Sequence, residues 1–106
     1  MATIRVVELT GGAPGNRYSG AQARAAIEGA LARNDSCAVD FAGIDSVTQS
    51  FADEAVGVLV RGRGPDVLDS LTFLHCVPAV RDVLEFVVDY SGQFWSTGTF
   101  PTPTPA

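Results

Sequence analysis

The stretch that decides the fold is VDFAGIDSVTQSFADEAVGVLV, which runs from Val39 to Val60. It opens within a short apolar segment, residues 38–41, which predicts a β-strand, and a loop containing glycine follows. After the loop, Ser50 and Asp53 have the spacing of a capping box, in which a hydroxyl accepts a hydrogen bond from an amide of the first helical turn. The stretch therefore predicts a buried strand, a loop and a helix that begins at Ser50.

The segment after Ser50 has the pattern of an amphipathic helix. Asp53 and Glu54 lie in its first turn, where negative charge is favourable against the helix dipole. Apolar residues recur at helical spacing and predict one buried face, formed by Phe51, Ala55, Val58 and Leu59. Residues 61–65, RGRGP, predict the end of the helix near Val60, because Gly closes helices and Pro prevents their continuation.

The rest of the chain alternates between strand and helix patterns. Residues 3–9 and 71–74 are rich in β-branched and apolar side chains and predict further strands. Ser19-Gly20-Ala21-Gln22 has the spacing of a second capping box and predicts the start of another helix. A last helix is expected from Pro78 to Ser91-Gly92, with a second apolar edge formed by Phe86 and Tyr90. Residues 93–100 could form either an added strand or a tail that docks on the domain.

These elements together predict an α/β fold. A strand, a helix and a further strand in succession imply parallel pairing through a right-handed crossover. We expect a small domain with a mostly parallel sheet of about four strands and with helices packed mainly on one face. The domain is expected to span residues 1–92, and residues 93–106 to form an aromatic and Pro/Thr-rich C-terminal tail.

Three groups of residues together resemble one known family. They are Val39-Asp40-Phe41, Gly43-Ile44 and the helix start Ser50-Phe51-Ala52-Asp53-Glu54. In this order they resemble the STAS-like domain of unknown function, which is related to the STAS domains of anti-sigma factor antagonists. The resemblance covers roughly residues 3–90, judged by motif and by the order of elements. It implies a small STAS-like fold.

The resemblance also implies a role like that of anti-sigma factor antagonists, which are bacterial regulatory proteins. Those proteins bind a serine kinase that holds a sigma factor, and phosphorylation at the start of this helix breaks the complex. Their Asp-Ser-Ser or Asp-Ser-Thr triplet falls here on Thr48-Gln49-Ser50. Gln49 occupies the phosphorylated position and cannot carry a phosphate, so a phosphorylation switch would have to use Thr48 or Ser50.

We therefore expect a non-catalytic protein–protein interaction or regulatory module that is recognised through the loop and helix start around Ser50. The expected partner is a kinase-like or sigma-regulating protein. The expected partner-binding residues are Asp45, Ser46, Thr48, Gln49, Ser50, Phe51 and Asp53, with Ser50 and Thr48 as candidate phosphorylation sites. The simpler interpretation of Ser50 as a helix cap alone fits the same pattern, and the oligomeric state stays open.

Two other functions remain open. Free amides at the helix start could hold a small anion or a nucleotide. A hydrolase would use Ser50, His75 and Asp40, because these residues could meet near the carboxyl ends of strands. No nucleophile-elbow glycine pattern surrounds Ser50, however, so we expect neither a catalytic centre nor a cofactor.

The composition argues against several other classes. The net charge is −5 and all seven basic residues are scattered Arg, whereas nucleic-acid binding needs a clustered basic face. No apolar run approaches the length of a membrane span, and residues 1–5 lack the pattern of a signal peptide, so we expect a cytoplasmic protein that binds no membrane. Cys37 and Cys76 are expected too far apart for a disulfide, and no metal site is expected.

Overall fold

The computed structural model describes residues 2–11 and 15–97 of the chain. At its centre lies a parallel sheet of three strands, β1 (Ala2–Arg5), β2 (Cys37–Asp40) and β3 (Leu71–Leu74), in the spatial order β1-β2-β3. The α/β class and the parallel pairing are confirmed. The expected four strands are not, since the described residues form three.

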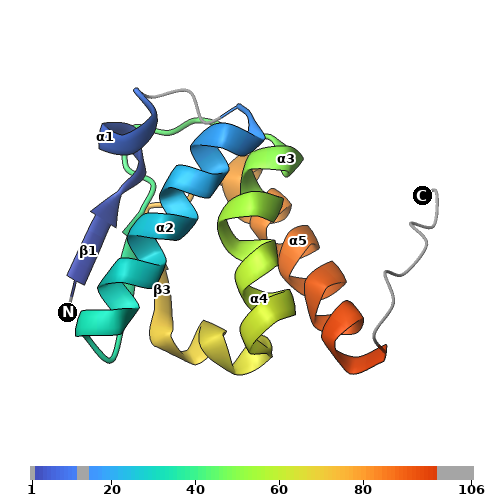
Figure 1. Cartoon of the computed structure of the whole chain (residues 1–106). Coiled ribbons are helices and arrows are strands. Elements are labelled where there is room, and N and C mark those ends of the chain that lie inside the picture. Colours follow the sequence, from blue (N-terminus) through green and yellow to red (C-terminus); the bar gives the residue numbers. More distant parts are fainter. Residues whose placement is uncertain (1, 12–14, 98–106) are drawn as a thin grey trace.

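Helices connect the strands and form one layer (Figure 1). The α-helices are α1 (Val6–Thr10), α2 (Arg17–Arg33), α3 (Gln49–Ala52), α4 (Val58–Arg63) and α5 (Pro78–Thr97). A π-helical turn, η1 (Asp53–Gly57), joins α3 to α4 in one continuous helix, and a 3₁₀ turn, η2 (Pro65–Ser70), leads into β3. Figure 1 shows α2, α4 and α5 side by side, with α4 in the middle.

The sheet buries one face and leaves much of the other open. Successive side chains of a strand point to opposite faces. Ile4, Val39 and Leu71 lie on the face that the helices cover, and all three are buried. Thr3 and Thr72 lie on the other face and are exposed. The helices therefore pack mainly against one side of the sheet, as predicted.

The first strand is shorter than predicted. The pattern over residues 3–9 predicted one strand, but β1 ends at Arg5 and α1 begins at Val6. Thr10 Oγ1 donates to the Val6 carbonyl oxygen, and Gly11 closes the helix with a left-handed φ of 70°. The pairing of β1 ends where β2 ends, so the β-branched residues beyond Arg5 have no strand to join and coil into a helix.

The first long helix begins before its predicted cap. The N-cap of α2 is Asn16, whose side-chain oxygen accepts from the Ser19 N–H at 2.8 Å. Ser19, the predicted cap, lies inside the first turn, and its hydroxyl donates back to Asn16. Asn16 takes the cap because it has the extended backbone that this position requires.

The last helix is longer than predicted. Its end was expected at Ser91-Gly92, but α5 continues to Thr97. The buried Ser91 hydroxyl accepts a hydrogen bond from Arg61 Nη1, on α4, at 3.0 Å. Because the hydroxyl is bonded to another helix, it does not compete for the backbone of α5 and does not end that helix. Within the predicted tail, residues 93–97 are therefore helical rather than an added strand, and residues 98–106 lie outside the described residues.

The helix α2 crosses α3 and η1 at close range. A Cβ atom placed on Gly20 would lie 2.6 Å from the Phe51 carbonyl oxygen and 2.8 Å from Glu54 Cβ. Only glycine leaves room for the two backbones to approach this closely. Phe51 is 1% exposed and packs in the core, so the crossing fixes the position of the helix start.

Both cysteines are free thiols in the structure, and burial raises the pKa of each. Within residues 2–11 and 15–97, no helix combines the length and the apolar character that crossing a bilayer requires.

The close crossing predicts opposite effects for two glycine substitutions in α2. Gly20→Ala should lower the free energy of unfolding by about 1–3 kcal/mol, because backbone atoms cannot move aside for the new methyl group. Gly29→Ala is the matched control, since its methyl group would meet only the flexible end of Arg33, at 3.7 Å. It should raise stability by roughly 0.5–1 kcal/mol. Urea unfolding measures both variants, and equal effects would contradict the close crossing.

Candidate functional site

The helix start near Ser50 is capped by Thr48. Thr48 has an extended backbone, with φ −82° and ψ 157°, and its Oγ1 accepts from the Phe51 N–H at 3.1 Å. Ser50, the predicted cap, lies inside the first turn, so the predicted capping box is wrong. The helix begins earlier because Val47, just before the cap, is buried in the core and fixes how the chain enters the helix.

The predicted recognition residues occupy three environments. Four of them are exposed on the loop and at the first position of α3, namely Asp45, Ser46, Thr48 and Gln49. Ser50 and Asp53 are half-buried beside them. Phe51 belongs to the core, so its side chain supports this surface from beneath and does not form part of it.

A groove with a volume of about 390 Å³ lies next to the helix start. Its lining comes from α2, α3, η1 and α5, and consists of Arg17, Gln49, Ser50, Asp53, Phe86, Val87 and Tyr90. Three residues predicted from the sequence thus meet an arginine and an aromatic pair from distant parts of the chain.

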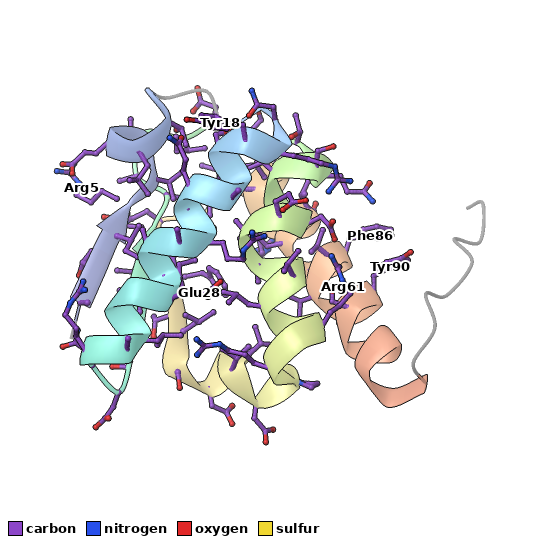
Figure 2. All side chains as sticks on the ribbon, viewed as in Figure 1. Arg5, Tyr18, Glu28, Arg61, Phe86 and Tyr90 are labelled. Atoms are coloured by element: carbon purple, nitrogen blue, oxygen red, sulfur yellow. The ribbon has the colours of Figure 1, made fainter. Side chains whose placement is uncertain are left out.

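Phe86 and Tyr90 form an aromatic wall of this groove. They lie one turn apart on α5, and their rings stack with centroids 6.2 Å apart and planes 20° apart. Phe86 is 46% exposed, and Figure 2 shows both rings projecting from α5, with Arg61 nearby. The predicted second apolar edge of the last helix is confirmed. An exposed aromatic surface of this kind is typical of interaction sites.

Asp53 and Glu54 tie the elements around the groove together. Arg61 Nη1 donates to Asp53 Oδ1 at 2.6 Å and to Ser91 Oγ at 3.0 Å, which links the central helix to α5. Arg17 Nη1 donates to Asp53 Oδ2 at 3.0 Å and to Glu54 Oε1 at 3.2 Å, and these bonds link the central helix to the start of α2. These contacts hold three helices in a fixed arrangement.

The arginine partners lower the pKa of both acids. Arg24 Nη1 donates to Glu54 Oε2 at 2.8 Å, and this bond, helped by Arg17, holds the pKa of Glu54 below its ordinary value. Burial alone would raise the pKa of Asp53, but hydrogen bonds from Arg61 and Arg17 outweigh it, and the pKa of Asp53 is also lowered. Both carboxylates are therefore ionised and paired at neutral pH.

The residues of the hydrolase alternative lie in two places. Asp40 Oδ1 lies 2.8 Å from His75 Nδ1 and accepts from the Ala42 N–H at 2.9 Å. The bond with His75, followed by that with Ala42, holds the pKa of Asp40 below its ordinary value. His75 is 66% exposed and adopts a left-handed φ of 57°. Ser50 instead lines the groove, and among the described residues no hydrogen bond joins it to His75.

Sequence reasoning missed the contacts that Arg17 and Arg61 make with Asp53. It predicted the apolar edge of Phe86 and Tyr90 but not that this edge lies beside Ser50. Arg61 reaches back along its own helix to Asp53, because helical side chains point toward the N-terminus. The opposite charges of these two residues on one predicted helix could therefore have indicated this contact from the sequence. Arg17 and Phe86 come from other elements, and no local pattern brings them to the helix start. In the part of the chain that the structure describes, no group of three His, Cys, Asp or Glu side chains could hold a metal ion.

Acid should weaken the fold through Asp53 and Glu54. Because their folded pKa values are lowered, their stabilisation is present above the unfolded pKa values and is lost as the pH falls through the lower folded values. In the variant Asp53→Asn, the free energy of unfolding should therefore fall less steeply than in the wild type as the pH drops from about 5 to about 2. Urea denaturation at each pH measures this difference. Asp45→Asn, which removes an exposed loop carboxylate, is the control, and an equal flattening by it would contradict this assignment.

Comparison with known proteins assigns the chain to a family. No curated protein and no solved structure is similar enough to the chain to count as a match. The model of a family described as the STAS-like domain of unknown function matches residues 19–81, which is more than half of the chain. This range contains β2, the helix start around Ser50 and β3. The chain belongs to the family of STAS-like domains of unknown function.

Proposed function

We propose that this chain is a non-catalytic regulatory module that binds another protein through the surface around Ser50. The observation that carries the proposal is the groove in which Gln49, Ser50 and Asp53 meet the stacked pair of Phe86 and Tyr90. Membership in the STAS-like family supports it, because the anti-sigma factor antagonists that the chain resembles are switched at the start of the same helix.

The chemistry of the groove favours a protein partner over a small anion. The guanidinium group in its lining belongs to Arg17, and it already donates to Asp53 and Glu54. A phosphate or nucleotide would have to displace these carboxylates, and the described residues that line the groove include no second cationic side chain to compensate. A protein surface can instead cover the aromatic wall and use the exposed polar loop as a rim.

The proposed partner is a kinase-like or sigma-regulating protein with a basic contact surface. The chain carries a net charge of −5, and the exposed loop contributes Asp45 to the proposed surface. Charge of opposite sign on the partner would speed the encounter and select against acidic proteins. His75 contacts Asp40, and no hydrogen bond joins it to Ser50 in the described residues, so the hydrolase that would use Ser50, His75 and Asp40 is not part of the proposal.

Ser50 and Thr48 are the proposed phosphorylation sites, and they differ in what a phosphate would do. A phosphate on Ser50 would add negative charge in the groove, where Asp53 already contributes a carboxylate. A phosphate on Thr48 would leave an acceptor near the Phe51 N–H that the hydroxyl now caps. Phosphorylation of Ser50 is thus expected to disrupt the proposed surface, and phosphorylation of Thr48 to remain compatible with the helix start.

Capture from a lysate of the host tests the proposed surface. The immobilised full chain should retain a kinase-like or sigma-regulating protein. Ser50→Glu should reduce retention about tenfold or more, because it adds a carboxylate in the groove that contains Asp53. Thr3→Glu is the matched control, since it adds the same charge on the open face of the sheet, on β1, and should retain the partner.

A second pair of variants tests the aromatic wall in the same capture experiment. Phe86→Ala should also weaken retention, because a truncated aromatic anchor typically costs more than about 1 kcal/mol of binding free energy. Leu9→Ala removes another exposed apolar side chain, on α1 and outside the groove, and should have no effect. Equal retention by the wild type, Ser50→Glu and Phe86→Ala would contradict the proposed surface.

Phosphorylation has a separate test. Incubation with ATP and the captured kinase-like protein should add the mass of one phosphate to the intact chain. Ser50→Ala or Thr48→Ala should abolish that gain and so identify the modified hydroxyl. A wild-type chain whose mass never changes would remove phosphorylation from the proposal and leave the binding surface to the capture experiment.

A further inference from the structure

The outer edge of β3 is open for pairing. The Phe41 N–H donates to the Leu74 carbonyl oxygen at 2.9 Å, so the backbone groups of Leu74 face toward β2. Successive residues in a strand present their backbone groups to opposite sides. The N–H and C=O of Phe73 therefore face away from the sheet, and among the described residues no hydrogen bond reaches them. An edge of this kind can pair with another strand.

A second groove, with a volume of about 650 Å³, lies along this edge between β3, η2 and α5. Much of its lining is apolar, with Leu68, Leu71, Phe73, Leu84 and Val88. Of these, Leu68, Phe73 and Val88 stay partly exposed. An occupant that supplies both a strand and an apolar helix face would cover the backbone edge and the groove together.

The rim of the groove carries both signs of charge on one helix. Arg81, Glu85 and Asp89 follow one another at intervals of one turn along α5. Arg81 and Asp89 are separated by about 12 Å along the helix axis, so they cannot pair within one chain. If two α5 helices run antiparallel about a twofold axis near Glu85, Arg81 of each lies opposite Asp89 of the other.

This rim is therefore complementary to a copy of itself, as a twofold symmetric interface requires. The two Glu85 carboxylates would approach each other near the axis, which is unfavourable by itself. Each has an arginine beside it, since Arg81 Nε lies 3.9 Å from Glu85 Oε1 within the same helix.

We propose that a second copy of this chain docks on the β3 edge and forms a symmetric homodimer. The two β3 strands pair antiparallel, with Phe73 opposite Phe73 of the partner subunit. Residues paired in this way exchange both of their backbone hydrogen bonds. The two sheets become one continuous sheet, and the two α5 helices close the apolar groove over its centre and form two Arg81–Asp89 ion pairs.

The proposed dimer uses a different face of α5 from the surface around Ser50. Phe86, Val87 and Tyr90 line the groove at the helix start, whereas Arg81, Leu84 and Val88 line the groove at the β3 edge. Dimerisation and partner binding can therefore be measured and can fail independently of each other.

Analytical ultracentrifugation of the full chain with charge-exchange variants tests the dimer. The wild type should dimerise reversibly. Arg81→Glu and Asp89→Arg should each raise the dimer Kd about tenfold or more, because each turns two attractive pairs into repulsive ones. The double variant Arg81→Glu/Asp89→Arg should return to within about threefold of the wild type, because the pairs re-form with reversed sign.

A control and a second readout complete the test. Arg33→Glu/Asp35→Arg makes the same charge exchange at the exposed end of α2 and should leave the dimer Kd unchanged. The Phe73 amide should exchange its hydrogen more slowly above the dimer Kd than below it. The proposal would be overturned if the wild type were monomeric or if the single variants left the dimer Kd unchanged. It would also be overturned if the double variant did not regain the wild-type Kd, or if the Phe73 amide were protected equally at all concentrations.

Discussion

The half-buried carboxylate of Asp53 is the point on which the arrangement of the helices depends. It accepts hydrogen bonds from Arg61 on its own helix and from Arg17 on α2, and Arg61 also donates to Ser91 on α5. Charges removed from water must be matched, so these contacts fix where α2 and α5 lie against the central helix. Gly57 makes the arrangement possible, since a Cβ there would lie 2.8 Å from Asp53 Oδ1 and 2.9 Å from Ser91 Oγ. The groove beside Ser50 exists because the three helices are held at this spacing.

The helix α5 has three surfaces with different roles. Val80, Leu84 and Val87 pack in the core and attach the helix to the domain. Phe86 and Tyr90 face the groove at the helix start, and the charged residues on a third side border the open edge of β3. A helix with one role needs a single apolar stripe. Charged residues on the outer side of a surface helix are ordinary, but the exposed ring of Phe86 lies outside that single stripe.

Local chemistry determines the part of the fold that the sequence predicted. The apolar run of β2 and the Gly64-Pro65 pair at the end of α4 are recognisable without knowledge of the rest of the chain. The helix caps were misplaced because polar residues within three positions of each other compete, and only the burial of neighbours such as Val47 decides between them. In the candidate site, Gln49, Ser50 and Asp53 could be found from their position at a helix start. Arg17 and Phe86 could not, because they reach the groove only through tertiary packing.

The connectivity of the sheet constrains how the chain can fold. Ala2 pairs with Cys37, Cys37 pairs with Leu71, and no strand in the described residues pairs with its neighbour across a short turn. A hairpin can form early because its turn brings two strands together at a small cost in chain entropy. Here each pairing must first close a long loop that contains a helix. We therefore expect the sheet and the helical layer to form together during folding.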